Sequence, residues 1–216
     1  MDFEFWDNCW SRPSQPFHLK QTHHFLLRYY QQYFAGKKKA LLPLCGKSQD
    51  LIFLARNNMH AVGVEFNPKA VESFWQANQL EPESRDVAGK KHFRASNTEL
   101  WQCDFFELSI KDTGVFDVIF DRAALIALPE QLRQQYANHL QNFLTTDGVL
   151  LVVTMDYEPN EMSGPPFYVS LDELQELFSE ATITELDRHT IIESHPRWQE
   201  LQLSWLDEIV YEIRFN

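Results

Sequence analysis

Short apolar runs alternate along the chain with stretches in which apolar residues recur at helical spacing. The runs predict seven buried strands, at residues 39–44, 61–65, 100–103, 116–121, 149–154, 182–186 and 206–215. The other stretches predict helices at residues 22–34, 48–57, 67–78, 129–143 and 171–178. Residues 80–95 are polar and show neither pattern.

This alternation of strand and helix predicts a doubly wound α/β fold with a mostly parallel, seven-stranded sheet covered on both faces. The last two runs have no helical pattern between them, so we expect one antiparallel edge strand. In such folds, ligands bind beyond the carboxyl ends of the strands. Chemistry is therefore to be sought in the turns after the first four strands.

Composition narrows the class of protein. With 216 residues, we expect one domain spanning residues 1–216. A net charge of −12 makes nucleic acid an unfavourable partner. Three cysteines without a C-x-x-C motif argue against a disulfide framework or a zinc site, and no histidine shows metal-ligand spacing. For that reason we expect no bound metal. No signal peptide or membrane span is evident, so we expect a cytoplasmic protein.

The first turn, in LLPLCGKSQD (residues 41–50), allows three interpretations. A phosphate loop would need a glycine at Leu41, and a dinucleotide turn would need three glycines where only Gly46 is present. S-adenosylmethionine has no phosphate and needs only one tight turn. Glu65 follows about 20 residues later, at the end of the second strand, where an acid can bind ribose hydroxyls. The alternative is that Glu65 is a solvent-exposed residue at a strand end.

The next two strand ends carry further candidates. After the third strand, Asp104 and Phe105 could bracket an adenine, although the Phe105–Phe106 pair could also be core. After the fourth strand, Arg122 could bind a carboxylate of the ligand or an anionic acceptor. A salt bridge from Arg122 to Asp117 or Asp121 is the competing interpretation.

Seven segments occur together in the order seen in one known family. They are FWDNCW, PFH, LPLCGKSQDL, VGVE, CDFFEL, FDVIFDRAALIAL and GPPFYVS. From Phe5 to about Trp198 the chain resembles the thiopurine S-methyltransferases, in particular their bacterial branch. The combination of PLCGKS, GVE and DRAAL is far more specific than a single glycine motif.

The resemblance implies a class I methyltransferase fold that binds S-adenosyl-L-methionine, releases S-adenosyl-L-homocysteine and methylates the sulfur of aromatic or heterocyclic thiols such as thiopurines. Residues 1–35 would form an N-terminal helical segment covering the cofactor and substrate. The expected cofactor contacts are Trp10, Leu44, Gly46, Glu65, Asp104, Phe105 and Arg122. The expected acceptor contacts are Trp6, Phe17, His18 and Phe167, and His18 and Arg122 are the catalytic candidates.

Several alternatives stay open at this point. His18 could accept a proton from the thiol or only position it. Leu19 and Pro16 differ from the residues common in the family, which affects acceptor preference. Selenium or tellurium species are alternative acceptors for a detoxifying enzyme, and a non-catalytic cofactor-binding module is a further possibility. An amino-group methyltransferase is disfavoured because Gly164-Pro165-Pro166-Phe167 follows the fifth strand rather than the fourth. We expect a monomer that binds a small molecule.

Overall fold

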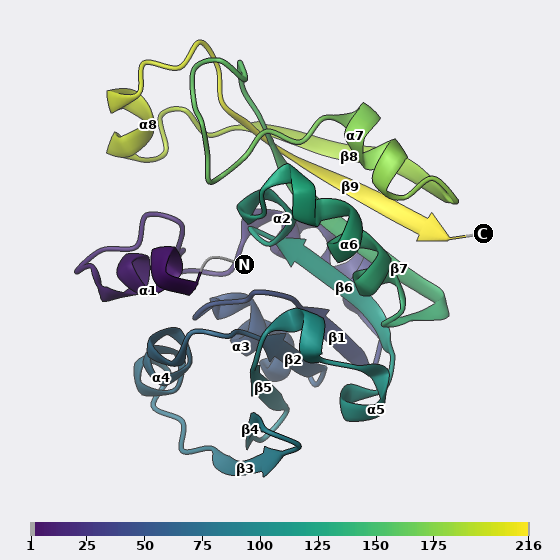
Figure 1. Ribbon diagram of the computed structural model, residues 1–216. Helices are drawn as coiled ribbons and strands as arrows, with labels where there is room; N and C mark the ends of the chain where they lie inside the picture. Colours follow the sequence, from purple (N-terminus) through teal and green to yellow (C-terminus); the bar gives the residue numbers. More distant parts are fainter. Residues whose placement is uncertain (1–2, 216) are drawn as a thin grey trace. The chain divides into compact units, whose positions relative to one another are not determined.

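The computed structural model describes residues 3–215, which form two compact units (Figure 1). The first unit extends to Ile119 and the second begins at Phe120. Each unit combines strands with helices and is described by itself. The expectation of one domain stays a prediction.

The centre of the first unit is a parallel sheet, as the buried apolar runs predict. Its four strands are β1 (Lys39–Leu42), β2 (His60–Val64), β5 (Thr98–Gln102) and β6 (Phe116–Arg122), the last of which crosses the boundary between the units. β2 pairs with β5 on one side and with β1 on the other, and β1 pairs in turn with β6. Leu41 lies opposite Val62 and Ile119, and none of the three side chains is exposed. Burial on both faces explains why these strands lack alternation.

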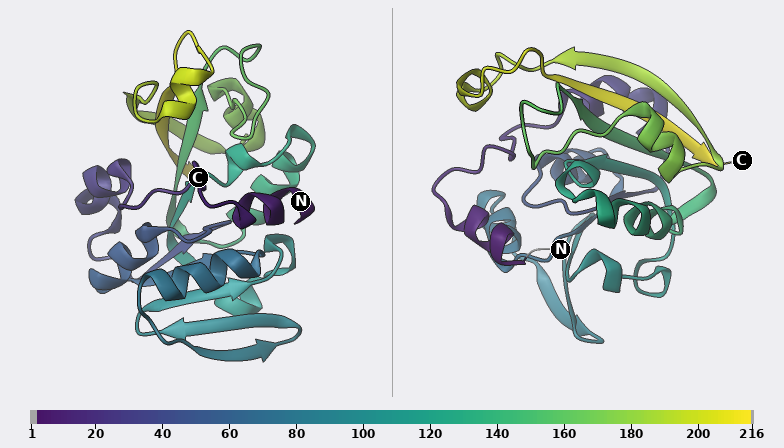
Figure 2. Two further views of the ribbon diagram at one scale, coloured as in Figure 1. Left: turned by 90° about the vertical axis from the view of Figure 1, so that its left-hand side faces the viewer. Right: turned by 45° about the horizontal axis from the view of Figure 1, so that its top comes forward.

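The patternless residues 80–95 contain two strands that the sequence did not reveal. β3 (Glu83–Val87) and β4 (Lys90–Ala95) form an antiparallel hairpin, and β4 pairs with β5 (Figure 2). Ala88 and Gly89 connect the strands with φ values of 52° and 82°, as a tight hairpin turn requires. Residues 3–215 therefore contain nine strands, and the expected number of seven is wrong. The α/β class with a parallel centre is confirmed.

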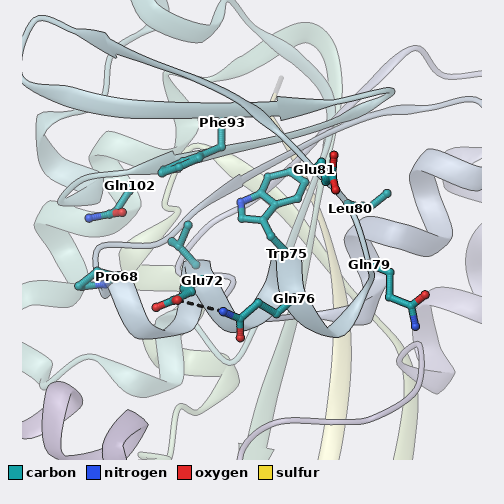
Figure 3. A pocket seen from close by; sticks show the side chains of 10 residues that line it. Pro68, Glu72, Trp75, Gln76, Gln79, Leu80, Glu81, Phe93 and Gln102 are labelled. Atoms are coloured by element: carbon teal, nitrogen blue, oxygen red, sulfur yellow. Dashed lines mark hydrogen bonds between the residues drawn. The ribbon is translucent and has the colours of Figure 1, made fainter.

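The helices of the first unit begin at recognisable capping residues. They are α1 (Phe3–Ser11), α2 (His24–Tyr29) with a π-helical continuation (Tyr30–Phe34), α3 (Gln49–Arg56), α4 (Pro68–Ala77), a 3₁₀ turn (Phe105–Glu107) and α5 (Ile110–Thr113). Asn67 accepts a hydrogen bond from the Lys69 amide, and Pro68 occupies the first turn, which confirms the predicted start of α4. α3 packs on β2 and β5, and α4 packs on β5 and α1. One face of α4 also lines a hollow together with Phe93 of β4 (Figure 3).

The second unit is built on antiparallel strands. Its further elements are a 3₁₀ turn (Leu125–Ala127), α6 (Glu130–Gln141), β7 (Leu144–Asp156), α7 (Leu171–Leu177), β8 (Ala181–Thr190), α8 (Pro196–Glu200) and β9 (Asp207–Phe215). β9 lies between β7 and β8 and is antiparallel to both. The expected antiparallel pair is thus confirmed, although the short helix α8 interrupts a segment in which no helix was expected.

Two expectations about the chain as a whole can be compared with the described residues. Cys9, Cys45 and Cys103 are all free thiols. Between residues 3 and 215, no helix has the length and apolar character needed to cross a membrane.

A charged cluster lies near the beginning of β2 and β5, at the opposite end of these strands from the predicted binding edge. Glu99 is 8% exposed, and its carboxylate lies 3.0 Å from Nε2 of His60 and 3.3 Å from Nε2 of His92. Burial by itself would raise the pKa of Glu99, but the neighbouring imidazoles outweigh it and lower the pKa to about 2. The ionised carboxylate is therefore the form that stabilises the fold.

We predict that Glu99→Gln lowers the free energy of unfolding at pH 7 and that this loss shrinks in acid. The pKa of Glu99 is lowered from 4.5 to about 2 in the folded chain, so its contribution is complete above pH 4.5 and disappears as the pH falls toward 2. Urea unfolding of both proteins at pH 7, 4.5 and 3 measures the difference, with Glu130→Gln, at an exposed helical position, as the control. A difference that is unchanged at pH 3 would contradict this role.

Candidate functional site

The turn after β1 has a strained backbone that brings the amides of Cys45 and Gly46 close to the end of β2. Leu44 and Gly46 have φ values of 47° and 54°, in the left-handed region that glycine tolerates and leucine rarely adopts. The amide of Cys45 donates to the carbonyl of Val64 at 2.9 Å, which ties the turn to the end of β2. Ser48 then caps α3 by accepting a hydrogen bond from the amide of Asp50. Strain of this kind is often found where backbone groups face a ligand.

Glu65, directly after β2, connects this turn with the start of α4. One carboxylate oxygen accepts the amide of Gly46 at 2.9 Å, and the other accepts the amide of Asn67 at 2.7 Å. Glu65 is only 4% exposed, so the interpretation of it as a solvent-exposed residue at a strand end is wrong. Burial raises the pKa of Glu65 to about 7, although the backbone donors act in the opposite direction. Each oxygen still has a lone pair that could accept a hydrogen bond from a hydroxyl group.

A cavity of about 250 Å³ lies between the segments that follow β2 and β5 and the first turn of α1. Phe3, Phe66, Cys103 and Asp104 line it. The rings of Phe3 and Phe66 have centroids 5.5 Å apart, so two aromatic side chains form one wall. Asp104 contributes a carboxylate that also accepts the amide of Phe106 at 3.0 Å. The cavity thus offers aromatic faces and one acceptor, a composition suited to a purine base.

The aromatic residues at this cavity differ in part from those singled out in the sequence. Phe105 is 1% exposed and is not among the residues that line the cavity, whereas Phe106 is half-buried. Phe3 and Phe66 were not expected at the site from the sequence. The position of Phe66 next to Glu65 was an available signal, but nothing in the sequence placed Phe3 opposite it.

Trp6, Trp10 and Phe17 form an aromatic cluster over the strained turn. Phe17 meets Trp6 and Trp10 edge to face, with centroids 5.6 and 5.1 Å apart. A methyl group added to Gly46 would lie 2.8 Å from Cζ2 of Trp10, so only glycine lets the indole approach this closely. His18 follows Phe17 directly and is half-buried, with its amide donating to the carbonyl of Gln15 at 3.0 Å.

The side chain of Lys47 contacts the N-terminal segment beside this cluster. Its ammonium group lies 5.8 Å from the centre of the Trp10 ring and donates to the side chain of Gln15 at 2.9 Å. Partial burial lowers the pKa of Lys47. This arrangement does not support the phosphate-loop interpretation, because the ammonium group of Lys47 contacts the N-terminal segment.

Polar contacts hold α1 against the start of α4. Asp7 lies 2.7 Å from the ammonium group of Lys69 and accepts the side-chain amide of Asn67 at 3.2 Å. Lys69 also donates to the hydroxyl of Ser11 at 2.8 Å. The backbone amide of Asn67 donates to Glu65, so Asn67 links the N-terminal helix to the buried acid.

The remaining candidates belong to the second unit. Arg122 ends β6 and is half-buried. Its neighbour Asp121 is fully buried and accepts hydrogen bonds from the Leu125 amide at 3.0 Å and the Tyr136 hydroxyl at 2.7 Å. Burial raises the pKa of Asp121 to about 6. Asp117, the other proposed partner of Arg122, accepts the amides of Lys38 and Lys39 in the first unit.

Phe167 lies in the segment between β7 and α7. Its amide donates to the carbonyl of Ile126 at 2.7 Å, and the guanidinium of Arg133 lies 5.5 Å from the centre of its ring. Gly164 adjoins the ring so closely that a methyl group there would lie 2.4 Å from Cδ1. The Phe167 ring is therefore held in place within the second unit.

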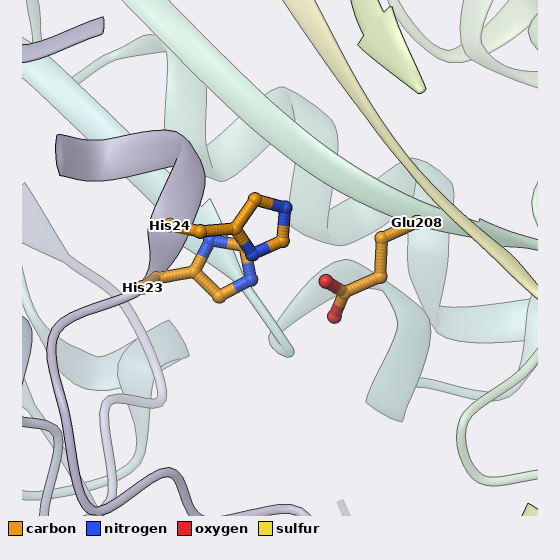
Figure 4. A group of neighbouring side chains, drawn as sticks. All are labelled: His23, His24 and Glu208. Atoms are coloured by element: carbon orange, nitrogen blue, oxygen red, sulfur yellow. The ribbon is translucent and has the colours of Figure 1, made fainter. Parts of the chain in front are cut away.

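The adjacent histidines His23 and His24 stand at the start of α2 (Figure 4). His23 is 1% exposed; its amide donates to the carboxylate of Asp50 at 2.7 Å, and its ring caps α2. The two imidazole centroids are 4.5 Å apart. Glu208, which Figure 4 also draws, belongs to β9 of the second unit, where it pairs with Met155 of β7. These contacts give His23 a structural role at the helix start.

Comparison with known proteins identifies the family. The family model described as thiopurine S-methyltransferase (TPMT) matches residues 1–216. A thiopurine S-methyltransferase of Pseudomonas aeruginosa (strain LESB58) is 37% identical over 213 residues, which is 98% of each chain. Another, of Shewanella baltica (strain OS185), is 36% identical over 216 residues, or 99% of each chain.

Solved structures with low sequence identity share the fold. The N-methyltransferase NodS from Bradyrhizobium japonicum WM9, in complex with S-adenosylhomocysteine, has a TM-score of 0.65 at 13% identity, covering 99% of this chain and 97% of that chain. A SAM-dependent methyltransferase from Anabaena variabilis ATCC 29413 has a TM-score of 0.65 at 12% identity, covering 89% and 82%. The family match over the whole chain, together with relatives similar over nearly their full length, shows that this protein belongs to the thiopurine S-methyltransferase family and is a methyltransferase that uses S-adenosyl-L-methionine.

Proposed function

We propose that the enzyme methylates the sulfur of aromatic or heterocyclic thiols such as thiopurines. The observation that carries this proposal is the cluster of Trp6, Trp10 and Phe17 over the Gly46 turn. Its aromatic edges and faces suit a planar acceptor, and it lies beside the turn that we propose for the cofactor. The names of the relatives from Pseudomonas aeruginosa and Shewanella baltica support the same acceptor class.

The residues of the first unit fit S-adenosyl-L-methionine. Glu65 would accept the ribose hydroxyls, and the cavity beside Phe66 and Asp104 would hold the adenine. Leu44 and Gly46 would present backbone groups to the methionine end, under the indole of Trp10. The pocket has one tight turn in place of a pyrophosphate cradle, which matches a ligand without phosphates. Phe105 would contribute through its backbone, because its side chain is buried.

When bound, S-adenosyl-L-methionine supplies a methyl group on a positively charged sulfur, already activated for transfer to a nucleophile. The protein then has to align the acceptor and keep water away from it. Alignment of this kind can lower a barrier by about 7–11 kcal/mol. Trp6 and Phe17 are the proposed acceptor contacts in the first unit. The roles of Phe167 and Arg122, which belong to the second unit, stay predictions from the sequence.

His18 is the proposed residue for handling the thiol proton. Thiols attached to aromatic or heterocyclic rings are acidic enough to ionise without a strong base, so positioning by His18 suffices for them. For a less acidic thiol, an imidazole could accept the proton near neutral pH. We favour positioning, because the preferred acceptors ionise on their own.

The direct test is a methyl-transfer assay with a panel of acceptors. We expect turnover with 6-mercaptopurine and thiophenol, slower turnover with aliphatic thiols, and a selective loss with aliphatic thiols in His18→Ala if the imidazole accepts a proton. Selenite and tellurite form a separate arm of the panel. Turnover confined to that arm would replace thiol methylation with the detoxifying alternative, and binding of S-adenosylhomocysteine without any turnover would indicate a non-catalytic module.

We predict that the affinity for S-adenosylhomocysteine rises with pH up to about pH 7. The pKa of Glu65 is raised to about 7 in the free protein, and ribose hydroxyls donate better to the ionised carboxylate, so binding lowers this pKa. A hydrogen bond to a charged group contributes about 1.5–3 kcal/mol, which predicts at least a tenfold loss of affinity in Glu65→Gln. Calorimetry between pH 5.5 and 8.5 measures both effects. The exposed Glu83→Gln serves as control and should retain the pH dependence.

We predict that Gly46→Ala weakens binding of S-adenosylhomocysteine and lowers stability. The new methyl group would lie 2.8 Å from Trp10, and alanine at a positive φ costs about 1–2 kcal/mol by itself. Gly36→Ala is the matched control, because Gly36 also has a positive φ (80°) but no atom within 4 Å of the added methyl. Thermal unfolding and calorimetry compare the two variants. Equal effects in both would mean that the Trp10 contact has no role at the turn.

A further inference from the structure

Lys47 belongs to the Gly-Lys-Ser motif in the turn after β1, but the proposed cofactor site gives it no role. Its two neighbours are accounted for, because Gly46 lies against Trp10 and Ser48 caps α3. The ammonium group of Lys47 donates to the side-chain oxygen of Gln15 at 2.9 Å. Both side chains are half-buried, so water weakens this contact less than it would at the surface. The contact joins the turn after β1 to the N-terminal segment.

Gln15 makes three hydrogen bonds that together hold the turn before His18. Its carbonyl accepts the amide of His18 at 3.0 Å, which closes a turn over residues 15–18. Its side-chain nitrogen donates to the carbonyl of Arg12, just beyond the end of α1. Its side-chain oxygen accepts Lys47. A side-chain amide that is bound at both its nitrogen and its oxygen keeps one orientation, so Gln15 fixes this turn relative to the turn after β1.

The turn held by Gln15 carries the proposed acceptor contacts. The ring of Phe17 meets Trp6 and Trp10 edge to face, and His18 follows directly in the chain. The ammonium group of Lys47 lies 5.8 Å from the centre of the Trp10 ring, within the range of a cation–π contact. Lys47 thus contacts a residue expected at the cofactor and also holds the turn expected at the acceptor.

We propose that Lys47 is a positioning residue for methyl transfer, which aligns the acceptor through Gln15. It keeps the turn with Phe17 and His18 at a fixed place beside the turn proposed for the cofactor. Transfer requires the acceptor sulfur to lie in line with the methyl group, and a misplacement of about 1 Å can lower the rate about a hundredfold. This role rests on the proposed function, in which Phe17 and His18 contact the acceptor.

A double-substitution cycle in the full-length protein tests this proposal. Lys47→Met keeps most of the side chain and removes the ammonium group, whereas Gln15→Leu removes the amide. Each should lower kcat/KM for thiophenol and 6-mercaptopurine about tenfold, because the acceptor is less well aligned. The double variant should lose no more than either single variant, because both substitutions break the same contact.

Three further measurements separate positioning from a general loss of structure. Lys47→Arg keeps a cationic donor and should recover most of the lost rate. Lys91→Met, at an exposed position of β4, makes the same change in net charge and should keep full activity. The affinity for S-adenosylhomocysteine, measured by calorimetry, should change far less in Lys47→Met than kcat/KM does.

Hydrogen exchange reports the contact without any turnover. The amide of His18 donates to the carbonyl of Gln15, and the amide of Cys45 donates to Val64 in the turn that contains Lys47. In Lys47→Met the His18 amide should exchange several-fold faster, while the Cys45 amide keeps its rate. Gln15→Leu gives the same comparison if Lys47→Met does not fold. Equal acceleration of both amides would overturn the positioning role, because it would mean that the turn after β1 itself had loosened.

The results also distinguish this role from the proposed acceptor class. If the unsubstituted protein methylates thiols but the two substitutions act additively, Lys47 does not act through Gln15 and the proposed function stands. If only selenite or tellurite is methylated, the proposed acceptor is wrong, and the same cycle measured with that acceptor decides the role of Lys47. Absence of turnover with every acceptor would overturn both.

Discussion

The candidate site depends on one buried carboxylate. Glu65 accepts the amide of Gly46 with one oxygen and the amide of Asn67 with the other, so it joins the turn after β1 to the start of α4. This bridge adds to the hydrogen bond from Cys45 to Val64, which ties the turn to β2, and to the side chain of Asn67, which caps α4. Burial makes the arrangement costly for the ionised acid, as the raised pKa shows. A ligand that donates hydroxyl groups to the carboxylate would offset this cost.

The N-terminal segment is connected to the same bridge in two ways. Trp10 rests on Gly46, and Asp7 binds Asn67 and Lys69. The Asp7–Lys69 pair is partly exposed and adds little stability by itself, so the packing of Trp10 on Gly46 and of Phe3 on Phe66 is the stronger attachment. A segment held mainly by packing on the turn after β1 is suited to cover a ligand bound at that turn.

The sequence predicted those parts of the fold in which burial leaves a pattern. The parallel strands were predictable from their apolar runs, and the Asn67–Pro68 helix start and the single-glycine turn were predictable from local backbone chemistry. The β3–β4 hairpin was not predictable, since its residues are mostly exposed and carry no apolar alternation. Phe3 was missed because its contact with Phe66 joins segments far apart in the chain. The burial of Phe105 and the half-burial of Phe106 could not be told apart from two adjacent phenylalanines.

The most direct test of this account is the ionisation of Glu65 itself. The side-chain carboxyl carbon of Glu65, followed by NMR as a function of pH, reports its pKa in the free protein and in the complex with S-adenosylhomocysteine. We predict a midpoint near 7 in the free protein and a clearly lower midpoint in the complex. A midpoint near 4.5 that does not change on binding would contradict both the burial of this acid and its role in holding the ribose.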